Sequence, residues 1–141
     1  MIKTLLDSSF LFALINQKDA NHAACATVAR DTTLHKAILV TVIPETCYLL
    51  HRWLGHAVMR AFIQNLQDPI WQIEQVQPQD WTRVNELLNQ YADARLDLVD
   101  ATLVAAAERL EIDTILTLDQ RDFRLIRPKH VDYFSILPRP E

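Results

Sequence analysis

Glycine is almost absent from this chain of 141 residues, with Gly55 as its single example. Walker-type loops and dinucleotide-binding loops need several glycines where the backbone approaches phosphate, so both kinds of site are excluded. Cysteine is scarce as well, because Cys25 and Cys47 are the only two and form no Cys-x-x-Cys pair. Two cysteines cannot build a thiolate zinc site, and we expect two buried free thiols of the kind found in reducing compartments.

Long apolar runs and an excess of positive charge are also lacking. No segment reaches the roughly 18 consecutive apolar residues of a membrane span, and the first residues do not form a signal peptide. We therefore expect a cytoplasmic protein with no membrane contact. The net charge of −4 argues against nucleic-acid binding through overall electrostatics. A hydrophobic content of 50% in 141 residues predicts one globular domain over residues 1–141.

Apolar runs alternate with helical patterns along the chain. We predict strands over Ile2–Leu6, Ala37–Ile43, Trp71–Val76, Asp113–Leu118 and Tyr133–Leu137. We predict helices over Ser8–Ile15, Asp19–Arg30, Glu45–Leu54, His56–Leu66, Gln79–Tyr91 and Leu98–Leu110. This alternation predicts an α/β fold of three layers, with helices on both faces of a largely parallel sheet.

Acidic residues stand where the predicted strands end. Asp7 ends the first strand, Glu45 begins the helix after the second, and Asp119 follows the strand at 113–118. Asp100 lies in the first turn of the helix that leads into that last strand. Each acid alone is explained by the ordinary preference for acids at helix starts. Together they are expected to meet at the carboxyl edge of the sheet, where parallel α/β folds bind ligands.

Four carboxylates at one edge repel one another unless a cation lies among them. A site made only of oxygen ligands favours Mg²⁺ or Mn²⁺ over zinc. Apart from these four acids, the chain has as many acidic residues as its 14 lysines and arginines. The excess negative charge is therefore concentrated in the predicted metal site.

Several sequence segments resemble the PIN domain, and more narrowly the VapC-type toxin ribonucleases of prokaryotic toxin–antitoxin pairs. These segments are Leu-Leu-Asp7-Ser-Ser, Pro-Glu45, Leu-Val-Asp100-Ala-Thr-Leu-Val-Ala-Ala-Ala and Thr117-Leu-Asp119-Gln-Arg-Asp122-Phe123. The resemblance implies a PIN-like fold and a metal-dependent endoribonuclease, in which Asp7, Glu45, Asp100 and Asp119 are the catalytic and metal-binding residues. It also implies a homodimer and an antitoxin that blocks the acidic site, often with an arginine.

Other residues are expected to support this site. Asp97 is expected to cap the helix that carries Asp100, and Asp122 to lie behind the metal ligands. Thr117 is expected to face the same side as Asp119 and to orient a carboxylate or a water. Arg121 and Arg124, in a basic segment that also holds Arg127 and Lys129, are candidates for RNA binding beside the metal. A single-stranded RNA loop is the favoured substrate because its backbone is accessible.

The expected chemistry is hydrolysis by metal-activated water, which leaves a 5′-phosphate and a 3′-hydroxyl. Attack by the ribose 2′-hydroxyl instead needs a pair of histidines, and the five histidines form no evident pair. Three alternatives remain: a receiver-like signalling module, a PIN-fold RNA- or protein-binding module without useful turnover, and a PIN-type nuclease that acts on DNA. The single acid after the first strand disfavours the receiver, and the short chain disfavours a nuclease for structured DNA.

Overall fold

The fold was analysed in a computed structural model that describes residues 1–140. Five strands form one sheet: β1 (Ile2–Leu6), β2 (Leu34–Leu39), β3 (Gln72–Glu74), β4 (Thr114–Leu116) and β5 (Ser135–Leu137). The helices are α1 (Ser8–Ile15), α2 (His22–Ala29), α3 (Val42–Leu54), α4 (His56–Asn65), α5 (Asp80–Gln90), α6 (Leu98–Leu110) and α7 (Gln120–Leu125). No helix within residues 1–140 is long and apolar enough to cross a membrane.

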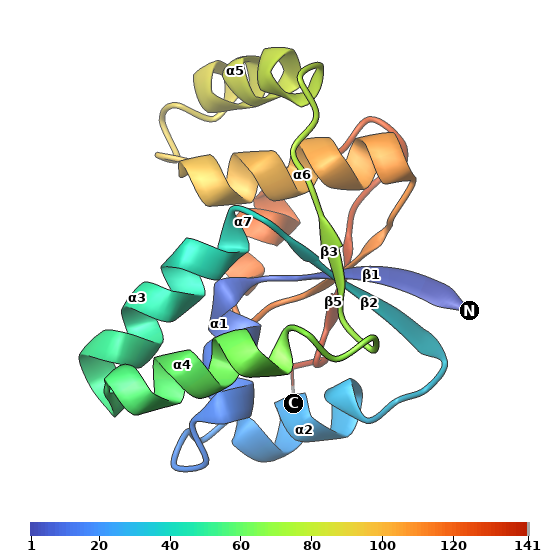
Figure 1. The fold of residues 1–141 in the computed structure, drawn as a ribbon. Coiled ribbons are helices and arrows are strands. Elements are labelled where there is room, and N and C mark those ends of the chain that lie inside the picture. The colour runs from blue at the N-terminus through green and yellow to red at the C-terminus, as the bar shows by residue number, and fades with distance from the viewer. Residues whose placement is uncertain (141) are drawn as a thin grey trace.

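The sheet is parallel throughout, as predicted, with strand order β3-β2-β1-β4-β5. Leu6 at the end of β1 pairs with Ile38 of β2 and with Leu116 of β4, so three central strands end at the same edge. Helices α1 and α2 lie on one side of the sheet, and α5 and α6 lie on the other (Figure 1). This is the three-layer α/β arrangement that the sequence predicts.

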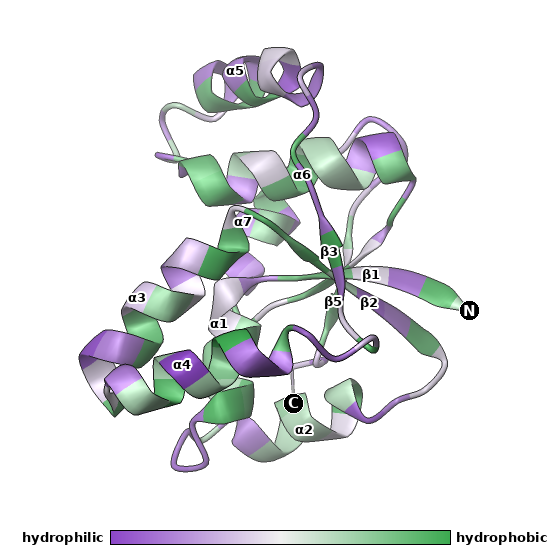
Figure 2. Cartoon of the chain, viewed as in Figure 1, coloured by the Kyte–Doolittle hydropathy of each residue, from purple (hydrophilic) through white to green (hydrophobic). Residues whose placement is uncertain are grey.

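The core forms between the central strands and the helices beside them. Leu5, Ile38 and Ile115 are fully buried on neighbouring strands. Figure 2 shows hydrophobic and hydrophilic stretches within β2. Helix α6 is buried along most of its length, and its alanines allow the helix to lie close to the sheet. Cys25 is buried and Cys47 is half-buried, and both are free thiols. The prediction of two buried thiols is therefore correct for Cys25 only.

Most predicted elements exist but with shifted ends, and the largest differences are at β2 and at α7. The second strand is Leu34–Leu39 rather than Ala37–Ile43, because Val42 and Ile43 already belong to α3. One continuous apolar run covers the end of the strand and the buried start of the helix, so its periodicity does not show the boundary. Helix α7 was not predicted at all, because its six residues are too few for a visible period.

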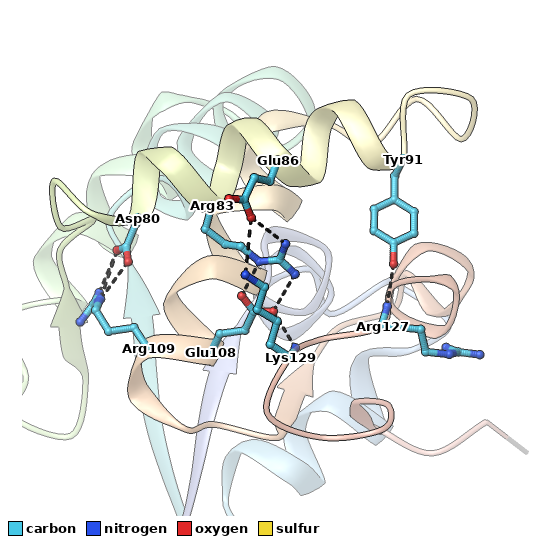
Figure 3. Close-up of polar contacts among 8 residues, drawn as sticks. All are labelled: Asp80, Arg83, Glu86, Tyr91, Glu108, Arg109, Arg127 and Lys129. Carbon is cyan, nitrogen blue, oxygen red and sulfur yellow. Dashed lines mark hydrogen bonds and ion pairs between the residues drawn. The ribbon is translucent and has the colours of Figure 1, made fainter.

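Helix α5 packs against α6 on the outer side of the domain through ion pairs as well as apolar contacts (Figure 3). Arg83 binds both carboxylate oxygens of Glu108, with Nε–Oε1 and Nη2–Oε2 distances of 2.7 and 3.0 Å. Arg109 of α6 pairs with the buried Asp80 at the start of α5, with 3.0 Å between Nε and Oδ1. These pairs fix the orientation of α6, whose first turn carries Asp100.

Candidate active site

Four helices begin at the carboxyl edge of the sheet, and each brings an acid there. Asp7 follows β1 and caps α1, and its carboxylate accepts a hydrogen bond from the Ser8 N–H. Asp119 follows β4 and caps α7. Glu45 and Asp100 lie in the first turns of α3 and α6. The positive end of each helix dipole therefore faces this acidic region and partly offsets its charge.

The most compact group of acids is Asp100, Asp119 and Asp122. Each offers a carboxylate oxygen, and these oxygens all lie within 4.8 Å of one another. From the sequence we expect Asp122 behind the ligands; in the structure α7 turns this first-turn acid toward Asp119, so that Asp122 offers an oxygen to the same compact group. Asp7 and Glu45 are not members of this compact group.

Asp7 lies beside the compact group and links it to Glu45. The charge of Asp7 raises the pKa of Asp100, and the charge of Glu45 raises the pKa of Asp7. Ser8 Oγ donates a hydrogen bond to Glu45 Oε1 and so ties the start of α1 to the start of α3. The five acids thus form one electrostatically coupled site, although only three could ligate a single ion in the observed side-chain positions.

Burial and mutual repulsion raise the pKa values of two acids in this site, Asp100 and Asp7. Asp100 is only 5% exposed, and burial, followed by the charges of Asp7, Asp97 and the α7 acids, raises its pKa to about 9. Burial raises the pKa of Asp7 to about 6, although hydrogen bonds from Thr117 and Ser8 oppose the shift. Within residues 1–140, none of these acids forms an ion pair with a basic side chain.

These carboxylates have the chemistry of a binding site for a hard divalent cation. The donor set contains only oxygen, which suits Mg²⁺ or Mn²⁺. A cation would also remove the repulsion that raises the pKa values of Asp7 and Asp100. The residues therefore fit such an ion, with Asp100, Asp119 and Asp122 as its nearest potential ligands.

Hydroxyl groups hold the acids in place. Thr117 Oγ1 donates to Asp7 Oδ2 at 2.8 Å and accepts the Asp119 N–H at 2.9 Å. Ser9 Oγ lies 3.1 Å from Thr117 Oγ1 and accepts the Leu118 N–H at 3.0 Å. Thr117 therefore orients a carboxylate, one of the two roles expected of it. Ser8 and Ser9 are predicted only to start a helix, although their place directly after a strand-end aspartate is a signal for a role in the site.

The other predicted site residues, Asp97, Arg121 and Arg124, lie at different distances from the acids. Asp97 caps α6 as expected, because its Oδ1 accepts the Asp100 N–H at 2.8 Å. Arg121 lies near the acids, and its charge lowers the pKa of Asp122 against the dominant effect of burial. Arg124 lies at the other end of α7, where it lines a separate cavity. About one and a half helical turns separate it from Asp119, and its role in RNA binding beside the metal stays a prediction.

Two histidines do meet, contrary to the expectation that no pair exists. The rings of His51 and His56 lie 5.3 Å apart across Gly55, which joins α3 to α4. No local pattern indicates this contact, because it depends on the turn at Gly55. The pair lies at the end of α3 away from Glu45, outside the acidic site.

Comparisons with known proteins agree with this architecture. A sequence model of the PIN domain matches residues 4–127. The chain is 26% identical over 134 residues to Ribonuclease VapC26 of Mycobacterium tuberculosis, which covers 95% of this chain and 99% of that protein. The crystal structure of VapC20 of Mycobacterium tuberculosis, described as a sarcin–ricin loop cleaving toxin, has a TM-score of 0.78 and 24% identity over 84% of this chain and 91% of that chain.

A toxin–antitoxin complex from Klebsiella pneumoniae shares the fold as well, with a TM-score of 0.63 and 18% identity over 85% of this chain and 89% of that chain. At these identities the solved structures show the fold alone. The family match covers most of the chain and includes the end of β1, the whole of β4 and all of the acids at the carboxyl edge. The chain belongs to the PIN domain family.

Proposed function

We propose that this protein is a metal-dependent endoribonuclease of the VapC type, folded as one PIN-like domain over residues 1–141. The observation that carries the proposal is the unpaired acidic group of Asp100, Asp119 and Asp122 beside the buried Asp7. The similarity to Ribonuclease VapC26 supports RNA as the substrate class. Intact acids distinguish this function from a PIN-fold binding module, and the named relative distinguishes it from a DNA nuclease.

Mg²⁺ or Mn²⁺ would be held by Asp100, Asp119 and Asp122, with Asp7 and Glu45 beside it. A bound divalent cation lowers the pKa of water and offsets charge at the phosphodiester that is hydrolysed. Asp7 is suited to accept a proton from the attacking water, because its carboxylate lies beside these acids and is held by hydrogen bonds from Thr117 and the Ser8 N–H. Thr117 fixes the position of that carboxylate, and Ser8 fixes Glu45. We expect products with a 5′-phosphate and a 3′-hydroxyl.

Cation binding is tested by titrating Mn²⁺ into the protein and measuring free Mn²⁺ by electron paramagnetic resonance. We expect Asp119→Asn and Asp122→Asn to weaken binding at least about tenfold, the scale of losing one charged ligand. Asp113→Asn is the matched control, because this exposed aspartate precedes β4 at the opposite edge of the sheet. Equal affinity in all four proteins would refute the metal site.

Cleavage is tested on total cellular RNA with the purified protein in Mg²⁺, in Mn²⁺ and in EDTA. We expect discrete products in the presence of either metal ion, none in EDTA, and none with Asp119→Asn. The Asp113→Asn control should cleave as the wild type does. Cleavage by Asp119→Asn at the wild-type rate would remove that residue from the mechanism.

We also propose an antitoxin and a second copy of this chain as partners. The toxin–antitoxin complex from Klebsiella pneumoniae shares the fold, which supports the first. An arginine of such a partner would satisfy the same unpaired carboxylates as a cation. Tyr48 and Trp53 on α3 are each 64% exposed, which supports a protein contact there. Sedimentation of the wild type beside Trp53→Ser tests the homodimer, and we expect the variant to be a monomer.

A further inference from the structure

A second cavity lies away from the acids, and we call it the basic cavity. Its volume is about 700 Å³, and its lining includes Arg124, Arg127, Arg139 and Tyr133. The first residues of three strands form its base, at the amino edge of the sheet: Ile2, Leu34 and Thr114. The acidic site lies at the opposite edge, so the two are different sites on one domain.

The charges of the basic cavity are unbalanced. Among residues 1–140, its lining contains three arginines and no acidic residue, in a chain whose net charge is −4. All three arginines are exposed, and none forms an ion pair with an acid within residues 1–140. The Arg127 side chain extends away from the ion pairs between α5 and α6 (Figure 3). Another cavity is also lined by arginines, Arg83 and Arg109, but these arginines are already paired with Glu108 and Asp80.

An aromatic ring stands beside these charges. Tyr133 is 67% exposed, although its neighbour Phe134 is buried against Phe123. Guanidinium groups that bind phosphates and an exposed ring on which a base stacks are the two elements of single-strand nucleic-acid sites. A volume of about 700 Å³ lies within the range of about 300–1,000 Å³ that small-molecule-sized groups occupy.

The basic cavity is also connected to the acidic site. Helix α7 begins at Asp119 and carries Arg121 and Arg124 toward the cavity. Asp7, directly after β1, and Ile2, the first residue of β1, are five residues apart, which corresponds to about 16 Å at about 3.3 Å per residue. At about 3.4 Å per nucleotide, an RNA strand covers that distance with about five nucleotides.

We propose that the basic cavity binds a single-stranded stretch of the RNA substrate, about five nucleotides from the bond that is cut. This inference rests on the proposed ribonuclease function. Arg124, Arg127 and Arg139 contact backbone phosphates, and Tyr133 stacks on a base. RNA is favoured over an acidic protein segment because arginines and an exposed ring together are the two elements of a single-strand nucleic-acid site.

Binding is measured without cleavage, in the Asp100→Asn background with EDTA, as the fluorescence anisotropy of labelled oligo(U) at several KCl concentrations. We expect the triple variant Arg124→Gln/Arg127→Gln/Arg139→Gln to weaken binding at least tenfold and to reduce the slope of log K against log salt by about 2, which is the value for three phosphate contacts. The control Lys18→Gln/Arg30→Gln/Arg60→Gln removes the same charge from elsewhere and should keep the slope. Equal losses in both variants would overturn the proposal.

Tyr133 provides a second test that leaves the charge unchanged. Tyr133→Phe keeps a ring and should bind as the wild type does, whereas Tyr133→Ala should weaken binding about tenfold, the scale of one lost stacking contact. Equal affinities would contradict the stacking role. If the triple arginine variant loses affinity for oligo-glutamate but not for oligo(U), the cavity is a protein site and the proposal is wrong.

Cleavage separates this proposal from the proposed function. In the triple arginine variant, a substrate with about ten nucleotides on each side of the cut should show a raised KM, and one with about two should be cut normally. If neither substrate is cut by the wild type while oligo(U) binding still depends on the arginines, the ribonuclease function fails and the basic cavity remains an RNA site. If both substrates are cut equally well by the variant, the basic cavity is not a substrate site.

Discussion

Asp100→Asn is expected to stabilise the protein in the absence of divalent cations. Asp100 has an ordinary pKa of 3.8, and burial among other acids raises its pKa to about 9 in the folded protein. Between pH 3.8 and about pH 9, Asp100 keeps its proton in the folded state and loses it in the unfolded state. The free energy of unfolding therefore falls as the pH rises through this range. The side chain accepts no hydrogen bond within residues 1–140 that asparagine would lose.

The destabilisation caused by Asp100 is about 1.4 kcal/mol for each pH unit by which the working pH exceeds its ordinary pKa of 3.8. The cost of keeping Asp100 is then about 4 kcal/mol at pH 7 and about 2 kcal/mol at pH 5. These are upper limits, because salt and small side-chain movements relieve part of the repulsion. A gain of even 2 kcal/mol corresponds to a rise in Tm of about 5 °C or more for a domain of this size.

The assay is urea unfolding in EDTA at pH 5 and at pH 8, with Asp80→Asn as the matched control. Asp80 is 3% exposed and also lies in the first turn of a helix, but it is paired with Arg109. We expect Asp80→Asn to lower stability by about 1.5–3 kcal/mol, the loss of a charge-assisted hydrogen bond. If Asp100→Asn is destabilising, or if its gain is the same at both pH values, the account of repulsion is refuted.

Three further outcomes follow from particular contacts. Thr117→Val removes a hydrogen bond to Asp7, so it should raise the pKa of Asp7 above about 6, and it leaves the Asp119 N–H unpaired. The acidic limb of the pH–activity profile should then move to higher pH, and an unchanged limb would contradict the role of Thr117. Gly55→Ala should lower the free energy of unfolding by about 1–3 kcal/mol, because the backbone φ of +101° is strained for alanine. Steric contact does not contribute, since nothing lies within 4 Å of the added Cβ. An unchanged urea midpoint would show that the turn relaxes. Glu108→Gln removes the ion pair with Arg83 and should lower the free energy of unfolding by about 1 kcal/mol. Glu111→Gln is the control and should show no loss of that size, because the Glu111 carboxylate forms no ion pair within residues 1–140.

The sequence predicts the site better than it predicts the boundaries of the elements. Asp7 and Asp119 are 112 positions apart, yet each follows an apolar run that forms a strand of the parallel sheet. The topology of parallel strands brings such ends to one edge, so their convergence follows from local patterns alone. The pattern of Leu98–Leu110 likewise predicts α6 with both of its ends correct.

Features that depend on tertiary contacts were not predictable in this way. Asp122 joins the compact group only because α7 forms, and a helix of six residues leaves no clear period in a sequence. The partner of Glu45, Ser8, lies 37 residues away, and no local pattern indicates that contact. The pairing of Asp80 with Arg109, which makes this buried acid unlike Asp100, also depends on how α5 packs against α6.

The central claim is that these acids act with a divalent cation to hydrolyse RNA. The most direct measurement is cleavage of one defined RNA by EDTA-treated protein after Mg²⁺ is added back, with the ends of the products identified chemically. The account predicts no cleavage before the addition, restored cleavage after it, and products that carry a 5′-phosphate and a 3′-hydroxyl. Cleavage in EDTA, or a 2′,3′-cyclic phosphate on the product, would contradict it.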